Sequence, residues 1–490
     1  MAVFDTNLCV NFTDYQSRQA ITLDCDFSSI QTPIRVVHPT AAECPSSAFD
    51  TPRSRKDPLH ANPKSFPGPV LVQTKPVIQP PRPVRSLFGT IFRGLISGAA
   101  NDDPCAVGTY AQAGAAFGFS FLWSAPFTFP MMAATIYLCS KLSVVTGKGI
   151  AGVVRDHYPR WLLYSLVFGI LAANIIEAGA DIGAIAAALG LFLHIPVTGI
   201  TLAIAIVILA VQTWGSYQLL QKVFAGLTLA LFAYMGAAFL ARPSAHEFVK
   251  ATLWPDLHLK RDYLVMLVAL IGTRLSPYLY FWESSQRVEE ETIIGRNPAQ
   301  ELRSAAWDVN AGMFFSNLIM YFVILCTAAT LFHAGERHIV TATQAAEALR
   351  PLAGNAARLL FALGIIGGGI LAVPVLTTGP AHALAEIFGW SHGLKKTPEG
   401  APEFYAVIFL STGVAIAIAF SGFNPISALL WASVIMGLLA PPLMLVIMLA
   451  VNNPNIMGPN TNGRWLKLLG WLTTLAVTAA AGGLIWTWLR

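Results

Sequence analysis

The sequence predicts an all-α membrane protein with about eleven transmembrane helices, and three observations support this fold class. Hydrophobic residues make up 55% of the 490-residue chain, whereas charged residues make up only 12%. A soluble protein carries about 25% charged residues. The mean hydropathy is +0.58, and long apolar stretches recur from about residue 87 to the C-terminus. These features exclude a soluble enzyme, a secreted disulfide scaffold and a nucleic-acid-binding module, and the net charge of +5 is small for this length.

Residues 1–85 differ in composition from the rest of the chain. They contain 12 of the 31 prolines and show no helical apolar period. Such a segment buries too little apolar surface to offset the entropy of ordering it, so we expect a disordered cytosolic N-terminal tail. The tail lacks the short apolar core of a secretory signal. It is either a variable extension or a regulatory, partner-binding segment.

The remaining residues, 86–490, are predicted to form the transmembrane domain. A transmembrane helix needs about 20 mostly apolar residues. Lys and Arg are enriched in the connections that follow even-numbered spans. This bias places the N-terminus in the cytoplasm and, for an odd number of spans, the C-terminus outside. We therefore expect an integral protein of the cell (inner or plasma) membrane. The candidate spans centre on 88–115, 119–145, 162–192, 197–214, 217–241, 263–286, 308–332, 356–387, 404–421, 427–450 and 466–488.

The first span is interrupted by charge and proline. Asp102 and Asp103 fall near its middle, and Pro104 follows them, with small residues on both sides. Proline removes a backbone donor and clashes with the preceding turn. A carboxylate at this depth costs a few kcal/mol unless it faces a partner or an aqueous cavity. A proline kink with a neutral, buried acid is the simpler alternative, but a kink does not require the acid.

The sixth span repeats this design. Pro277 lies mid-span beside Ser276, with Thr273 one turn earlier. Spans one and six are five helices apart, as expected for an inverted 5+5 repeat (LeuT-like) in which helices 1 and 6 are discontinuous. In such transporters the unwound carbonyls and half-helix ends form a cation site near the midplane. The predicted units are repeat one at about 87–241, repeat two at about 263–450 and an extra helix at about 466–488.

The residues at both breaks resemble the signatures of the NRAMP divalent-metal transporters. The family has Asp-Pro-Gly-Asn in its first helix, where this chain has Asp103-Pro104-Cys105-Ala106, and Met-Pro-His in its sixth, where this chain has Ser276-Pro277-Tyr278. The run from Gly272 to Trp282 is more similar to the NRAMP-related magnesium-transporter branch than to the iron and manganese members. The resemblance covers about residues 87–460.

The resemblance implies a metal site centred on Asp103. The family's ligating asparagine falls on Ala106, its methionine on Ser276, its histidine on Tyr278 and a carbonyl donor on Thr273. These replacements leave oxygen donors, which suit Mg²⁺, Ca²⁺ or Mn²⁺ better than softer metals. Mg²⁺ keeps several waters, so we expect Mg²⁺ first and Mn²⁺ next. The expected metal-binding groups are Asp103, the Ser276 hydroxyl, and carbonyls near Asn101, Asp102 and Thr273.

Two acids of the third span, Glu177 and Asp181, lie four residues apart and so share a helix face. The resemblance assigns Asp181 to a proton route, whereas the second acid of that route falls on Ala184. Proton coupling is therefore not expected, and a passive, voltage-driven flux is favoured. Alternatively, both acids are structural hydrogen-bond partners. Asn424 is expected to cap span ten or to line the site.

Arg274 would repel a dication unless it points away or pairs with Glu177, Asp181 or Glu283. Together with Ala106, it raises an alternative function, a non-transporting NRAMP-like membrane sensor or scaffold. A third possibility is another substrate, such as an amino acid with a coupling ion. We also expect His382 and Glu386, four residues apart, to form a local pair.

Nothing in the sequence indicates an enzyme. No P-loop, metalloprotease motif or nucleophile elbow occurs, so neither ATP-driven pumping nor hydrolysis is supported. None of the six cysteines has CxxC spacing. The expected partners are a divalent cation, carried as substrate, and the lipid bilayer, with no cofactor and no nucleic acid.

Overall fold

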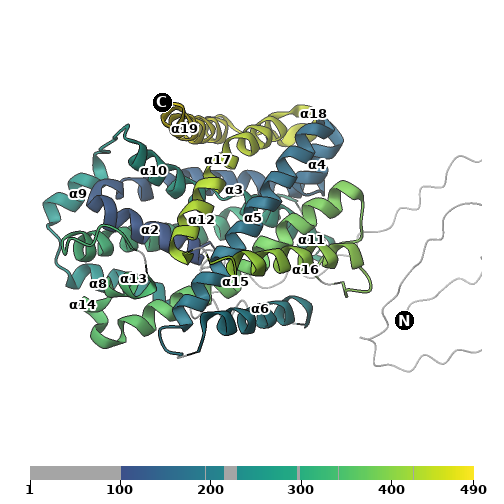
Figure 1. The fold of residues 1–490 in the computed structure, drawn as a ribbon. Coiled ribbons are helices and arrows are strands. Elements are labelled where there is room, and N and C mark those ends of the chain that lie inside the picture. The colour runs from purple at the N-terminus through teal and green to yellow at the C-terminus, as the bar shows by residue number, and fades with distance from the viewer. Residues whose placement is uncertain are drawn as a thin grey trace, which may run out of the picture. The chain divides into compact units, whose positions relative to one another are not determined.

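The computed structural model describes residues 101–490 except 194, 215–228, 295–297, 340, 395 and 423. The predicted tail and the first part of span one lie outside the described residues. The described part is helical throughout (Figure 1). Its longer helices are α2 (Pro104–Phe117), α3 (Ser124–Thr146), α5 (Arg160–Leu189), α6 (Val197–Trp214), α10 (Arg261–Arg274), α11 (Pro277–Ile294), α12 (Pro298–Thr327), α15 (Ala357–Phe388), α16 (Pro402–Ala419), α17 (Pro425–Asn452) and α19 (Arg464–Leu489).

Shorter helices connect these spans. They are α4 (Ile150–His157), α8 (Ala233–Leu240), α9 (Ala245–Leu253), α13 (Ala342–Glu347), α14 (Arg350–Ala353) and α18 (Pro454–Met457), with a π-helical turn over Ala328–Phe332. In Figure 1, α4 lies toward the right of the bundle and α13 toward the left. We call these the α4 end and the α13 end.

Eight helices within the described residues are long and apolar enough to cross a membrane, counting α10 and α11 as one span. They correspond to the second, third and sixth to eleventh predicted spans. Two shorter apolar helices, Val197–Ala210 and Ala230–Leu240, fall in the fourth and fifth. The first span is described only from residue 101 onward, where it contains α2.

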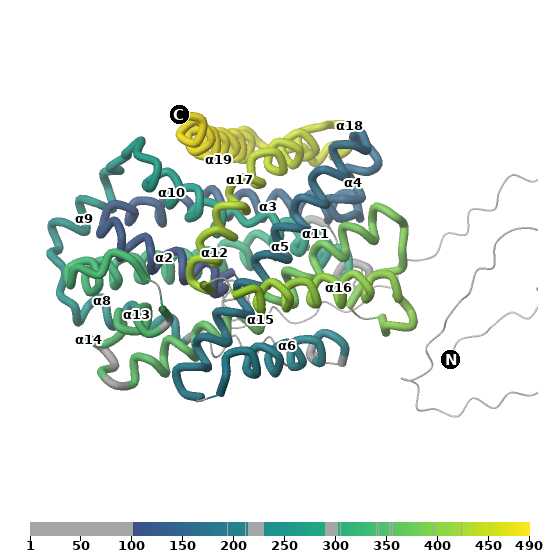
Figure 2. The backbone as a smooth tube through the Cα atoms, in the orientation of Figure 1, coloured from purple at the N-terminus to yellow at the C-terminus, as the bar shows by residue number. Residues whose placement is uncertain are grey.

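The interrupted sixth span lies at the centre of the bundle. About 89% of the most apolar 18-residue stretch of this span is buried, whereas the corresponding value for α16 is 33%. α10 packs along α17, and α5 packs against α15, α16 and α17. The tube in Figure 2 follows α2 from the middle of the bundle toward the α13 end, with α11 leading to the α4 end. The breaks in spans one and six therefore meet near the middle.

Both predicted breaks coincide with helix starts. α2 begins at Pro104, after Asp103 in an extended conformation with φ −69° and ψ 171°. α10 ends at Arg274, Leu275 leaves the helical region with φ −107° and ψ 46°, and α11 begins at Pro277. Proline is favoured at a first helical position because its missing N–H needs no partner there.

The contact between α10 and α17 depends on glycine. A Cβ atom added to Gly272 would meet the backbone of Ser433 and Gly437, lying 2.9 Å from the Gly437 Cα. A Cβ added to Gly437 would meet the Val268 carbonyl. Small residues allow membrane helices to approach at backbone distance, so this pair fixes how closely the two helices pack.

We expect Gly272→Ala to destabilise the protein by about 1–3 kcal/mol, because a backbone must move to admit the methyl group. Thermal unfolding in detergent measures this. Gly413→Ala is the matched control, since that exposed glycine of α16 has open space around it, and alanine is the better helix former. Equal melting temperatures for the two variants would contradict the assignment.

Candidate functional site

The site is built around Asp103, which joins the two breaks. One carboxylate oxygen, Oδ1, accepts the Ala106 N–H at 2.6 Å and so caps α2. The other, Oδ2, accepts the Tyr278 hydroxyl at 3.0 Å, from the first turn of α11. Asp103 is only 3% exposed. The carboxylate is thus held between the half-helices of the two interrupted spans, where it was predicted.

The N-terminus of α2 also receives a second carboxylate. The Cys105 N–H donates to Asp181 Oδ1 of α5 at 3.1 Å. Free N–H groups and the helix dipole make a helix N-terminus favourable for negative charge. Ala106 contributes its amide, and its side chain has no donor or acceptor. The structure therefore brings Asp103 and Asp181 together at one helix start.

Arg274 pairs with Asp102, which was not among the possible partners named from the sequence (Glu177, Asp181 and Glu283). Its Nη1 donates to Asp102 Oδ1 at 3.2 Å, and both side chains are fully buried. A charge buried at this depth needs a partner within reach. Asp102 directly precedes Asp103, but the two carboxylates have different partners. Asp102 is paired with Arg274, whereas Asp103 bonds to Ala106 and Tyr278.

Two further side chains complete this ion pair, and neither was predicted from the sequence. Arg274 Nη1 also donates to the Tyr110 hydroxyl at 2.6 Å, and Nη2 donates to Ser316 Oγ at 2.9 Å. Ser316 donates to Asp102 Oδ1 at 3.0 Å and accepts from Asn101 at 3.0 Å. Tyr110 is a hydroxyl-bearing residue within the apolar first span, and that is the signal that could have identified it.

The two predicted donors of the sixth span lie at its break. The Ser276 hydroxyl donates to the carbonyls of Gly272 and Thr273, both at 2.9 Å. The Thr273 hydroxyl donates to the Leu270 carbonyl at 3.0 Å. The Ser276 hydroxyl oxygen, which donates its proton, and the Thr273 carbonyl oxygen, which accepts one hydrogen bond, each keep a lone pair that is free to accept. Ser276 and the Thr273 carbonyl can therefore still face a cation.

The acids of α5 differ in how they are satisfied. Among the residues that the structure describes, neither carboxylate oxygen of Glu177 has a hydrogen-bond partner, and the same holds for Asp181 Oδ2. Glu177 is 1% exposed. Both acids interact electrostatically with Asp103. The structure thus gathers three carboxyl groups around the start of α2.

Asn424 lies away from this cluster as an exposed helix cap. Its side-chain oxygen accepts the N–H groups of Ile426 and Ser427 at 3.0 and 3.3 Å. This matches the predicted cap of span ten.

The α4 end is closed by polar contacts, and the predicted pair of His382 with Glu386 is not among them. His382 Nε2 bonds to Glu289 of α11 at 2.8 Å. Glu386 instead accepts the Gly152 N–H of α4 at 2.8 Å. Glu386 also accepts the Ser285 hydroxyl of α11 at 3.4 Å. Both residues therefore bond to neighbouring helices and not to each other, which helix spacing alone does not reveal.

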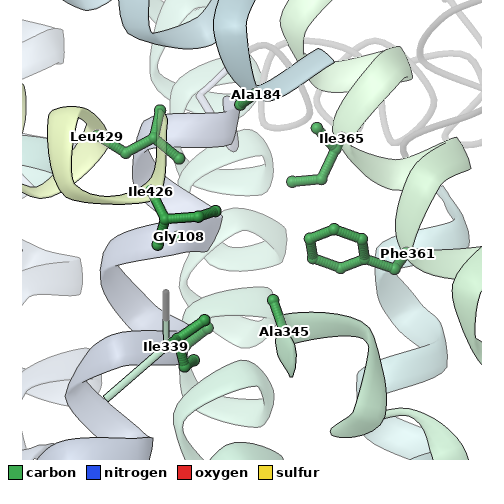
Figure 3. A pocket seen from close by; sticks show the side chains of 9 residues that line it. Gly108, Ala184, Ile339, Ala345, Phe361, Ile365, Ile426 and Leu429 are labelled. Carbon is green, nitrogen blue, oxygen red and sulfur yellow. The ribbon is translucent and has the colours of Figure 1, made fainter. Parts of the chain in front are cut away.

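The side toward the α13 end is apolar. A small cavity of about 10 Å³ lies beside α2, about the room that one water needs. Figure 3 shows Gly108, Ala184 and Leu429 around it, with Phe361 and Ile365 of α15 on the far side. Ala184, where the resemblance expected a second acid, adds only a methyl group.

No group of three or more His, Cys, Asp or Glu side chains in the described part is arranged to hold a metal ion. A group of three or more such ligands is typical of a permanently bound structural metal ion, which the protein coordinates fully. A site with one capped carboxylate, hydroxyls and carbonyls suits an ion that keeps part of its hydration shell.

Comparisons with known proteins agree with this architecture. The sequence model of the Nramp family, described as natural resistance-associated macrophage protein-like, matches residues 94–487. The divalent metal cation transporter MntH of Klebsiella pneumoniae (strain 342) is 27% identical over 395 residues, which cover 78% of this chain and 90% of that protein.

Two solved structures share the fold. The manganese transporter of Eremococcus coleocola, in complex with an aromatic bis-isothiourea substituted compound, superposes with a TM-score of 0.65 at 16% identity, covering 84% of this chain and 89% of its own. Mhp1, a nucleobase-cation-symport-1 family transporter, superposes with a TM-score of 0.50 at 12% identity, covering 81% and 92%. The fold of this chain is therefore LeuT-like. The chain belongs to the Nramp family of integral membrane proteins, which are transporters and not enzymes.

Proposed function

We propose that this protein carries divalent metal cations across the membrane by alternating access, with Asp103 as the central charge of the binding site. The observation that carries the proposal is the position of this carboxylate, buried between the half-helices of two interrupted spans. Discontinuous helices of this kind bind ions near the membrane midplane. The name of the MntH relative supports the same substrate class.

The buried Arg274 is compatible with a cation substrate, because its charge is balanced. Its Nη1 contacts Asp102, so the pair contributes no net charge next to Asp103. Asp103, Asp181 and Glu177 then remain as the acids around the start of α2. An anionic substrate is disfavoured by this excess of carboxylates, since like charges repel at short range.

We propose Mg²⁺ as the favoured substrate, with Mn²⁺ next, and membership of the magnesium-transporting branch of the family; the donor chemistry is what supports this proposal. Asp103, Ser276 and the Thr273 carbonyl offer oxygen only, and Ala106 offers no ligand through its side chain. Carboxylate, hydroxyl, carbonyl and water suit Mg²⁺ and Mn²⁺. Ala184 stands where the resemblance expects the second acid of a proton route, and Tyr278 where it expects a histidine, so we propose a passive flux without proton coupling.

The full topology is part of the same proposal. We propose eleven spans in two inverted repeats plus an extra helix, a cytoplasmic N-terminus and an external C-terminus. In this orientation the α4 end faces the cytoplasm. The polar contacts of α4 with α11 and α15 would then close the inner side.

The test is metal uptake by the purified protein in liposomes. Entrapped indicators for Mn²⁺, Mg²⁺ and pH report the flux of each ion, and protein-free liposomes give the background. We expect Mg²⁺ and Mn²⁺ uptake with no accompanying pH change. A folded protein that binds Mg²⁺ or Mn²⁺ but moves neither would instead indicate the membrane sensor, which the replacement of the family's asparagine by Ala106 favours.

Metal preference has its own test in Ser276→Met. A thioether at this position adds a soft ligand, which favours transition metals over Mg²⁺. We expect competition by Cd²⁺ to strengthen about tenfold relative to competition by Mg²⁺, a change of about 1.4 kcal/mol. Ser276→Ala, which removes the hydroxyl without adding sulfur, is the control. An unchanged ratio in the methionine variant would contradict the assignment of this position to the site.

A further inference from the structure

We infer that His382 and Glu289 form a proton-binding site at the α4 end, and that the bound proton holds the end of α11 against α15 and keeps this end of the bundle closed. The inference rests on the proposed function in one respect, namely that the closed end controls the passage of the transported cation. Glu289 lies eleven residues along α11 from Tyr278, or about 16 Å from the central site. The proton stays with the protein and is not carried across the membrane.

The first observation is that both ring nitrogens of His382 face hydrogen-bond acceptors. Nδ1 lies 2.8 Å from the Thr378 carbonyl oxygen, one turn earlier on α15. Nε2 lies 2.8 Å from Oε1 of Glu289. A carbonyl oxygen has no proton to donate, so Nδ1 must carry one.

A neutral imidazole cannot satisfy both contacts. It carries a proton on one nitrogen, so with Nδ1 donating to Thr378 the lone pair of Nε2 would face the Glu289 carboxylate. The contact is satisfied when one more proton is bound, either as imidazolium beside a carboxylate or as neutral imidazole beside a protonated acid. In both forms the pair holds one proton more than a neutral histidine and an ionised glutamate.

The second observation is that the pair is enclosed and yet connected to the α4 end. The His382 side chain is fully buried, whereas the Glu289 side chain is 17% exposed. The imidazole packs edge-on against Phe404 of α16 and Trp282 of α11, with ring centroids 4.7 and 6.4 Å from its own. Burial strengthens the hydrogen bonds of the pair, and the exposed edge of Glu289 lets the proton exchange with the aqueous phase at this end.

Ionisable groups of neighbouring segments surround the pair. His392, in the connection after α15, has its ring 5.8 Å from the imidazole. Glu386 of α15 interacts electrostatically with both histidines, and Tyr405 of α16 interacts with the carboxylate. On α11, Arg287 pairs with Glu283. A test of pH dependence must therefore compare variants of the pair with a variant of His392.

The third observation concerns the helices that the pair joins. The Ser285 hydroxyl of α11 also reaches α15, where it donates to Glu386 at 3.4 Å, a long distance for such a bond. α4 lies across this junction: its Ile150 N–H donates to Ser284 of α11 at 3.3 Å, and Arg155 donates to the Glu386 carbonyl. The 2.8 Å contact of the pair is therefore a stronger tie between α11 and α15 than the Ser285 bond.

Loss of the proton turns this tie into a repulsion. The lone pair of Nε2 then faces the Glu289 carboxylate or, in the other tautomer, the lone pair of Nδ1 faces the Thr378 carbonyl. A buried polar contact left unsatisfied is costly. α11 is separated from α10 by the break at Leu275 and Ser276, so its last turns can move away from α15 on their own. A higher pH at the α4 end therefore favours opening, and a lower pH favours closure, as in other histidine switches.

Metal uptake at two pH values tests the site. With the same buffer on both sides of the liposome membrane, the orientation of the protein does not matter. We expect Mn²⁺ uptake to be about fivefold faster at about pH 8 than at about pH 6, because histidine changes charge across this range. His382→Gln and Glu289→Gln should each reduce this ratio to less than about twofold, because an amide completes the contact without an added proton. His392→Gln is the matched control and should keep the wild-type ratio.

Hydrogen–deuterium exchange gives a second measurement, which needs no transport. After correction for the intrinsic pH dependence of amide exchange, the last turns of α11 should be better protected at about pH 6 than at about pH 8 in the wild type. In Glu289→Gln the protection should be equal at the two pH values.

The outcomes distinguish this inference from the proposed function. Wild-type protein without Mn²⁺ flux would overturn the proposed function, and exchange would still test the proton-binding site. Equal wild-type protection at the two pH values would overturn the site, and so would an equal uptake ratio in the wild type and Glu289→Gln. An internal pH signal that accompanies uptake in the wild type and disappears in that variant would make the pair part of a proton pathway and also overturn the inference.

Discussion

Replacing Asp103 is expected to abolish metal binding and flux. In Asp103→Ala the central carboxylate is gone, and the remaining oxygens of Ser276 and Thr273 are neutral. The substitution also removes the cap that Asp103 provides to α2. Loss of a cap costs about 0.5–2 kcal/mol of stability, so the alanine variant combines two effects.

Asp103→Asn separates them. An asparagine oxygen can still accept the Ala106 N–H, so the cap persists while the charge is lost. We expect Mn²⁺ and Mg²⁺ affinity to fall at least about a hundredfold, or about 2.7 kcal/mol, with the melting temperature close to that of wild type. Calorimetry and liposome flux measure the first, and thermal unfolding measures the second. Normal flux in both variants would remove Asp103 from the site.

Replacing Arg274 is expected to give the largest loss of stability. Arg274→Met leaves the Asp102 carboxylate buried without its counter-charge, and removing one partner of a buried pair costs about 3–5 kcal/mol. The same change leaves Ser316 and the Tyr110 hydroxyl with one partner fewer. Thermal unfolding and the yield of monodisperse protein in detergent measure the effect.

The double variant Asp102→Asn with Arg274→Met provides the control. Replacing both members of a buried ion pair is often close to neutral, so we expect it to recover much of the stability lost in the single variant. If Arg274→Met alone melted like wild type, the ion pair would not hold spans one and six together. Recovered stability with normal metal flux would further show that Arg274 acts on structure and not on the ion.

Much of this fold followed from local features of the sequence. Pro104 and Pro277 marked helix starts because proline cannot continue a helix from the preceding turn. The apolar lengths marked the spans, since a membrane helix satisfies its backbone internally. Asp103 was identified as a site residue because a carboxylate within an apolar span is energetically costly and usually functional. The resemblance of the same residues to the NRAMP signatures predicted that the substrate is a divalent metal ion.

Contacts between helices were less predictable. The partners of Arg274 depend on how α10 packs against the start of α2 and against α12, and no sequence spacing encodes that. His382 and Glu386 were expected to pair because helix geometry brings residues four apart together. In the structure His382 bonds to Glu289 of α11, whereas Glu386 accepts from α4 and α11. Ser316 was missed because a lone serine in an apolar helix usually bonds to its own backbone.

The glycine contact between α10 and α17 has a mechanical consequence. Two helices whose backbones touch at Gly272 and Gly437 cannot slide past one another without separating, so we expect them to move together. α11 packs instead against α3 and α15. Between α10 and α11, only Leu275 and Ser276 interrupt the chain. We therefore expect the two halves of the sixth span to turn about these two residues, beside the proposed cation site at Asp103.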